Sequence, residues 1–256
     1  MAFVKKLDAL FVHQRSRLHR LLLRPRLAKG LRFLPNIFTF CNAFFGFCSI
    51  VFSTYGDWVA AALFIFFGAL MDSLDGRIAR YIRITSELGL QLDSLSDAIS
   101  FCLAPAVLAF LWQLHRISFL GLGACALFLI AGLFRLARFN LTHTQQSISF
   151  LGTPTPIAGC CVAAIIMNMH ARLLSPLMLL GFGLLILMLA GLMVSSIPFP
   201  TFKQLPKQYL VLAITTFWIL AIIVGLPRIL LILFAAYFIF AFLAYIRTFH
   251  KNHTPD

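Results

Sequence analysis

Acidic side chains are scarce in this chain, since Asp and Glu make up only 8 of its 256 residues. Charged residues of both signs amount to 11% and hydrophobic residues to 61%, whereas a soluble domain averages about 25% charged and about 45–50% apolar residues. This composition excludes an ordinary soluble enzyme. It predicts a polytopic membrane protein with no soluble domain left over.

Cysteine and histidine motifs that bind metals are also missing. The six cysteines lie inside apolar runs without a CxxC pair, and the seven histidines are scattered through tails and loops. Neither a disulfide framework nor a zinc site is therefore expected.

Long apolar runs are abundant and predict eight transmembrane helices, because a hydrocarbon core of about 30 Å needs roughly 20 apolar residues per helix. The predicted ranges are 34–54, 58–80, 88–112, 118–139, 155–171, 175–197, 208–226 and 228–247. The expected fold class is all-α, a helical membrane bundle over residues 33–248 with a polar tail at 249–256.

The net charge of +13 could suggest a nucleic-acid partner, but its placement indicates a membrane surface instead. Nine Lys and Arg fall within residues 1–32, interleaved with Leu and Phe at near-helical spacing. This pattern predicts an amphipathic segment on anionic lipid, with a solvated basic tail as the alternative.

The same charges predict the orientation of the bundle. With the N-terminus inside, 18 of the 21 Lys and Arg fall on the inner side, and Arg116, Arg172 and Arg228 fall outside. The positive-inside rule then places both termini in the cytoplasm. Because the chain is compact and carries no sorting signal, we expect a bacterial inner membrane.

Four of the eight acids lie close together at the junction of the second and third predicted helices. Asp72 and Asp75 fall in the last turns of one helix, and Asp93 and Asp97 in the first turns of the next. Spacings of three and four residues put each pair on one helix face. Because the helices are antiparallel, all four carboxylates are expected at the cytoplasmic end, one or two turns below the surface.

Carboxylates this close repel one another, and acids within a membrane are costly even singly. Divalent cations would neutralise them, and hard oxygen ligands suit Mg²⁺, Mn²⁺ or Ca²⁺ rather than zinc. A paired-metal site suits in-line displacement at phosphorus. The alternative is a cation or proton transporter, although transport sites usually lie near the bilayer midplane.

The segments DSLDGRIAR (72–80) and GLQLDSLSD (89–97) together resemble the signature of the CDP-alcohol phosphotransferase family. This resemblance implies an integral membrane enzyme, typically a homodimer. It implies transfer of a phosphatidyl-type group from a CDP-linked donor to an alcohol, with release of CMP.

Other segments resemble one branch of that family, the membrane-embedded phosphatidylserine synthases. These segments are residues 34–47, 86–106, 134–140, 150–159 and 193–203. They imply CDP-diacylglycerol as the donor and the hydroxyl of L-serine as the acceptor. Phosphatidylglycerophosphate synthase, or a relative with another acceptor, is the alternative within the family.

The resemblance also implies roles for single residues. Two divalent cations, Mg²⁺ or Mn²⁺, are expected on Asp72, Asp75, Asp93 and Asp97, with Asp97 also acting as general base on the acceptor hydroxyl. The expected contacts to the CDP-lipid are Asn36, Thr39, Gly76, Ala79, Arg80, Ser86 and Gly89. For Asn36 and Thr39, helix capping or interhelical hydrogen bonding is the alternative.

Two arginines near the end of the fourth predicted helix are candidates for the acceptor pocket. Arg135 and Arg138 are three residues apart at the expected cytoplasmic end. Their guanidinium groups could bind the serine carboxylate or the lipid phosphate. Snorkelling to the membrane interface is the alternative.

Overall fold

The computed structural model describes residues 34–82, 87–142 and 152–195, together with the single residues Arg228, Ile232 and Phe234. All regular secondary structure in these three ranges is helical, which confirms the all-α class for this part of the chain. The predicted amphipathic segment at 1–32, the polar tail and most of the predicted spans 208–226 and 228–247 lie outside the described residues.

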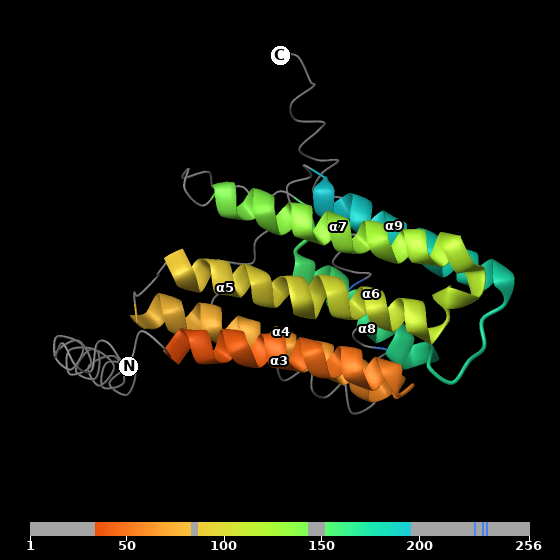
Figure 1. Ribbon diagram of the computed structural model, residues 1–256, viewed down its shortest axis with the longest axis horizontal. Helices are drawn as coiled ribbons and strands as arrows, with labels where there is room; N and C mark the ends of the chain where they lie inside the picture. Colours follow the sequence, from red (N-terminus) through yellow and green to blue (C-terminus); the bar gives the residue numbers. More distant parts are fainter. Residues whose placement is uncertain are drawn as a thin grey trace, which may run out of the picture.

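The described helices run side by side with roughly parallel axes (Figure 1). In chain order they are α3 (Leu34–Thr54), α4 (Trp58–Ile82), α5 (Glu87–Asp97), the π-helix η1 (Ala98–Leu103), α6 (Ala104–Trp112), the 3-10 helix η2 (Leu114–Ile117), α7 (Ser118–Thr142), α8 (Thr155–Met169) and α9 (Pro176–Val194). In Figure 1, α5 and α6 lie in one line between the α3–α4 pair and the α7–α9 pair.

Five helical segments are long and apolar enough to cross a membrane. They are Asn36–Thr54, Trp58–Gly76, Glu87–Trp112, Leu114–Leu141 and Pro176–Val194. These segments match five of the predicted spans. The predicted span at 155–171 is also a helix, Thr155–Met169, but at 15 residues it is shorter than the other five. The total of eight spans therefore stays a prediction.

Local sequence explains how the first helix pair reverses direction. Gly56 takes a positive φ of 77° between α3 and α4, a conformation that glycine adopts without steric strain. Asp57 follows, and its Oδ1 accepts a hydrogen bond from the amide of Ala60 at 3.0 Å. Asp57 thus caps the N-terminus of α4, which accounts for an acid at the end of the bundle opposite the four aspartates.

The third span is interrupted at its centre by the π-helix. η1 begins directly after Asp97 and ends just before α6, whose first turn contains Pro105. Proline has no amide hydrogen to donate to the preceding turn, so a regular α-helical ladder cannot continue through it. The wider turn lies beside the last of the four aspartates, and π-helical turns often occur at functional sites.

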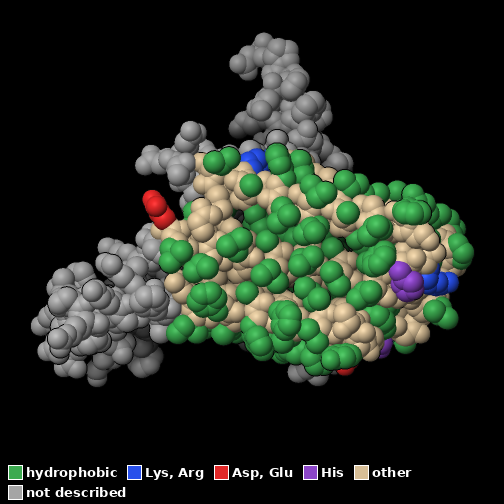
Figure 2. Space-filling view, viewed as in Figure 1, with side chains coloured by type: hydrophobic (Ala, Val, Ile, Leu, Met, Phe, Trp, Pro, Cys, Tyr) green, Lys and Arg blue, Asp and Glu red, His purple; other side chains and the backbone are tan. Residues whose placement is uncertain are grey.

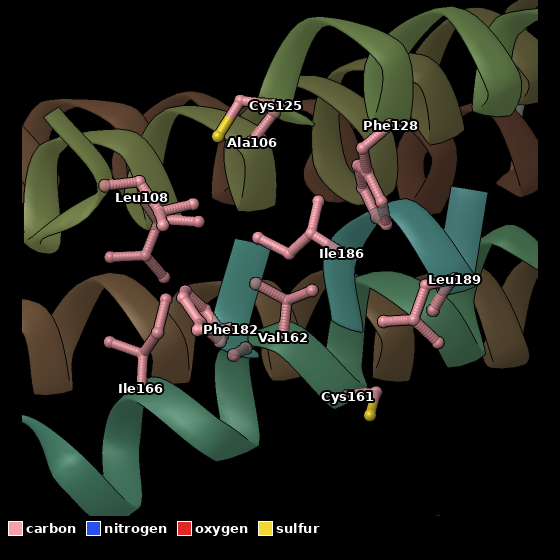
Figure 3. Close-up of a cluster of buried hydrophobic side chains, with 14 of the residues drawn as sticks. Ala106, Leu108, Cys125, Phe128, Cys161, Val162, Ile166, Phe182, Ile186 and Leu189 are labelled. Carbon is pink, nitrogen blue, oxygen red and sulfur yellow. The ribbon is translucent and has the colours of Figure 1, made fainter. Parts of the chain in front are cut away.

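Side chains from α6, α7, α8 and α9 meet in a buried apolar cluster (Figure 3). Leu108, Phe128, Ile166 and Ile186 are among its fully buried members. The outer surface is apolar as well, and hydrophobic side chains cover the middle of the face in Figure 2. An apolar exterior around an apolar core is what a lipid-embedded bundle requires.

Candidate active site

The C-terminal halves of α4 and α5 bring three of the four predicted acids together. Asp72 comes from α4, and Asp93 and Asp97 come from α5. One carboxylate oxygen from each lies within 4.8 Å of the other two. We call these three residues the acid cluster. Asp97 is buried, and the other two are half-buried.

The fourth predicted acid, Asp75, lies beside the acid cluster rather than in it. It is buried one turn beyond Asp72, and its Oδ2 accepts a hydrogen bond from the hydroxyl of Thr39 on α3. The sequence placed Thr39 against the CDP-lipid. In the structure its hydroxyl faces an acid, in agreement with the alternative of interhelical hydrogen bonding.

Asp97 has a comparable donor that the sequence analysis missed. The Nδ2 of Asn42, one turn after Thr39 on α3, donates to Asp97 Oδ1 at 3.1 Å. Asn42 is fully buried. A polar amide within an otherwise apolar span was the available signal, since a buried polar group needs a hydrogen-bonding partner.

Two serines join α3 to the third span at the same level. Ser96 Oγ donates to the carbonyl of Thr39, and Ser100 Oγ donates to the carbonyl of Asn42, both at 2.8 Å. The backbones approach closely here, because a Cβ on Gly46 would lie 2.8 Å from Ser100 Cα. Small residues at an interface permit this distance between membrane helices.

The two candidate arginines have different surroundings. Arg135 is buried, its Nη1 lies 3.5 Å from Thr155 Oγ1, and it is near enough to Asp97 to interact electrostatically with that carboxylate. Arg138 donates to the carbonyls of Val194 at 3.0 Å and Ser195 at 3.3 Å. Arg138 therefore caps the C-terminus of α9, a position that favours a cation.

The residues predicted to contact the CDP-lipid lie on α3 or in the sequence between Asp75 and Asp93. Gly76 and Gly89 are half-buried at the facing ends of α4 and α5, and Asn36 is half-buried in the first turn of α3. Ala79 and Arg80 belong to α4, and nothing further is described of their side chains; Ser86 lies outside the described residues.

A further polar contact links the site to α7. Ser94, next to Asp93, donates through its Oγ to Asn140 Oδ1 at 2.9 Å. The site thus has polar connections to α3 on one side and to α7 on the other.

The ligand chemistry of the acid cluster fits a hard divalent cation. All three candidate ligands are carboxylates, the group that Mg²⁺, Mn²⁺ and Ca²⁺ prefer, and no described cysteine or histidine belongs to the same group. Gly76 and Gly89, one turn from Asp72 and Asp93 in the sequence, are half-buried and carry no side chain. The site therefore offers carboxylate ligands suited to hard cations.

Comparisons with known proteins agree with this chemistry. The profile of the family described as CDP-alcohol phosphatidyltransferase matches residues 32–197. The CDP-diacylglycerol–serine O-phosphatidyltransferase of Helicobacter pylori (strain ATCC 700392 / 26695) is 35% identical over 185 residues, covering 68% of this chain and 74% of that protein.

Two further relatives come from distant organisms. The CDP-diacylglycerol–serine O-phosphatidyltransferase of Bacillus subtilis (strain 168) is 33% identical over 174 residues, covering 68% of this chain and 93% of its own. The archaetidylserine synthase of Methanothermobacter thermautotrophicus is 32% identical over 169 residues, covering 65% of this chain and 69% of that protein. Serine appears in the name of each of these three relatives.

Proposed function

This chain belongs to the CDP-alcohol phosphatidyltransferase family, and from that premise we propose that it makes phosphatidylserine from CDP-diacylglycerol and L-serine. The observation that carries the proposal is the acid cluster, three carboxylates within 4.8 Å at the junction of α4 and α5. The serine in the names of the relatives supports the acceptor. Family membership favours an enzyme over the cation or proton transporter.

The reaction exchanges a phosphoanhydride bond for a phosphoester bond. The serine hydroxyl oxygen forms a bond to the phosphorus that carries diacylglycerol, and the bond from that phosphorus to the bridging oxygen of the pyrophosphate breaks. CMP leaves with the electron pair. Asp97 would accept the proton from the serine hydroxyl, because an alcohol is too weak an acid to attack without a base.

Two divalent cations, Mg²⁺ or Mn²⁺, would be held by Asp72, Asp75, Asp93 and Asp97. Bound there, such ions neutralise pyrophosphate charge and stabilise the leaving group. Asp72, Asp93 and Asp97 would supply ligands from the acid cluster. Asp75, whose Oδ2 accepts a hydrogen bond from Thr39, would supply a further ligand from beside it.

The donor would enter along the helix ends that carry small residues. Gly76, Ala79 and Gly89 would let the nucleotide approach the backbone, with Arg80 as a cation for phosphate. Asn36, Thr39 and Ser86 complete the proposed set of CDP-lipid contacts.

The acceptor would lie between the acid cluster and α7. Arg135 is the better-supported contact for the serine carboxylate, because it is buried and interacts electrostatically with Asp97 of the acid cluster. Arg138 stays a candidate for the lipid phosphate, although its described hydrogen bonds go to the end of α9.

The chain is a multi-pass integral membrane protein, and we propose further that its acid cluster faces the cytoplasm of a bacterial inner membrane. The Lys and Arg distribution supports this orientation. It would let the water-soluble acceptor reach the site from the side where amino acids are made. Eight spans and a homodimer complete the proposed architecture.

An alcohol panel tests the activity directly. Purified full-length protein in detergent is mixed with CDP-diacylglycerol, Mn²⁺ or Mg²⁺, and either L-serine or glycerol 3-phosphate, and CMP is measured by chromatography. We expect CMP release with L-serine and loss of that release when EDTA removes the divalent ions. The reason is that the carboxylates repel the donor pyrophosphate without cations between them.

The other outcomes separate the alternatives. Release of CMP with glycerol 3-phosphate alone would assign the enzyme to phosphatidylglycerophosphate synthesis. No release with any alcohol, and no response to Mn²⁺, would show that the enzymatic proposal is wrong.

A further inference from the structure

Asn42 is enclosed on several sides within the helix bundle. Its side chain is fully buried, its Nδ2 donates to Asp97, and its backbone carbonyl accepts from Ser100. On the α4 side, a Cβ on Gly68 would lie 2.9 Å from Asn42 Oδ1. The Nδ2 of Asn42 is thus directed at Asp97, while its Oδ1 lies on the side of Gly68 and has no hydrogen-bonding partner among the described residues.

The chemistry of an amide suits this place better than that of other polar groups. A carboxylate accepts hydrogen bonds only, and an amide nitrogen offers it a neutral donor. A carboxyl group at position 42 would add a further acid beside Asp97. Thr39 acts in the same way one turn earlier, so α3 carries two donors that face acids on two other helices.

A second buried polar residue on α3 shows that burial alone does not explain Asn42. Ser49 lies two turns further along the same helix and is also fully buried. Its hydroxyl has no hydrogen-bonding partner among the described residues. Asn42 differs from Ser49 in facing a carboxylate of the acid cluster.

We propose that Asn42 is a positioning residue, whose amide holds the Asp97 carboxylate toward Asp72 and Asp93. This inference rests on the proposed function, since it gives the orientation of Asp97 a role in cation binding and in turnover. Outer partners that hydrogen-bond metal-ligating carboxylates fix their orientation. Their loss typically lowers metal affinity or activity by about 10- to 100-fold.

Direct measurement of Mn²⁺ binding tests the inference. Full-length wild-type protein, Asn42→Ala, Asn42→Asp and the control Ser49→Ala are titrated with Mn²⁺ in detergent, and free Mn²⁺ is followed by electron paramagnetic resonance. We expect the Mn²⁺ Kd of Asn42→Ala to rise by about 10- to 100-fold. Asn42→Asp keeps the volume but removes the neutral donor, so it should also lose turnover. Ser49→Ala should match the wild type.

Steady-state kinetics add a readout that a loss of packing would not produce. At saturating Mn²⁺, kcat should fall in Asn42→Ala while the KM for L-serine stays within about twofold, because Asn42 acts through Asp97 and not on the acceptor. Wild-type values of Kd and kcat in Asn42→Ala would overturn the inference, as would an equal loss in Ser49→Ala.

Folding is checked by size-exclusion chromatography and thermal unfolding. If Asn42→Ala does not fold, the Mn²⁺ Kd of Asn42→Asp is compared with that of the wild type instead. Equal Kd values would refute the positioning role. If neither variant folds, Asn42 serves folding and the inference is wrong. A wild-type chain that binds Mn²⁺ but releases no CMP with L-serine would instead overturn the proposed function. The Mn²⁺ Kd values of the wild type and Asn42→Ala would still test the role of Asn42.

Discussion

At the scale of residues, several polar side chains of this bundle each bind a specific partner helix. Thr39 and Asn42 face acids, Ser96 and Ser100 bind carbonyls of α3, and Arg138 binds the end of α9. Unsatisfied polar groups are costly within a bilayer, so such contacts fix the position of each helix end. These contacts also distinguish Arg135 from Arg138, which look equivalent in the sequence.

Substituting each arginine tests that difference. Arg135→Ala should raise the KM for L-serine by about tenfold or more, since a hydrogen bond to a charged group contributes about 1.5–3 kcal/mol. Arg138→Ala should chiefly lower the thermal unfolding midpoint, because a cation at a helix C-terminus contributes about 0.3–1 kcal/mol. Initial rates over a serine series, with CMP as product, give both KM values. A larger KM change in Arg138→Ala would assign the acceptor to Arg138 instead.

At the scale of elements, the contact between α3 and the third span decides where Asp97 lies. α3 packs along α4, α5, η1 and α6, and it approaches η1 closely at Gly46. The π-helix begins at the residue after Asp97. A displacement of η1 would therefore move the last acid of the site.

Gly46→Ala tests this contact. The added Cβ would lie 2.8 Å from Ser100 Cα, a backbone atom that cannot move alone, so we expect a lower unfolding midpoint and slower CMP release. Gly123→Ala in α7 is the matched control, since a Cβ there meets nothing within 4 Å. Alanine in a helix is favoured over glycine by about 0.5–1 kcal/mol, so this control should be as stable as the wild type or more so. Equal effects of the two changes would contradict the proposed role of the contact.

At the scale of the whole molecule, the four carboxylates of the candidate site lie together within an apolar bundle. The acids lie in the C-terminal halves of α4 and α5, while the turn between α3 and α4 precedes the N-terminus of α4 (Figure 1). A large apolar exterior separates the two ends. In a membrane this arrangement gives water-soluble and lipid-borne substrates access to the same site from its edge.

Cysteine labelling in intact bacterial cells tests which end faces outward. Tyr55 lies exposed in the turn between α3 and α4, and Glu87 lies exposed at the start of α5. A membrane-impermeant maleimide should label Tyr55→Cys but not Glu87→Cys, because the positive-inside rule puts the acid end in the cytoplasm. The unsubstituted chain measures background from its six cysteines. The reverse labelling pattern would overturn the proposed orientation.

The sequence by itself determined five of the apolar spans and the two carboxylate pairs on neighbouring helices. Those features depend on local periodicity: residues three or four apart share a helix face whatever surrounds the helix. Resemblance to a family then supplied the reaction, because the acids and glycines keep fixed spacings along two adjacent segments.

Only the tertiary structure decided which side chains complete the site. Asn42 is 55 residues from Asp97 and Thr39 is 36 residues from Asp75, so no local spacing relates them. The separation of Asp75 from the acid cluster, and of Arg138 from Arg135, likewise depends on which helix packs beside each. Contacts between helices follow from the packing of whole faces, and that packing sets the direction in which each carboxylate points.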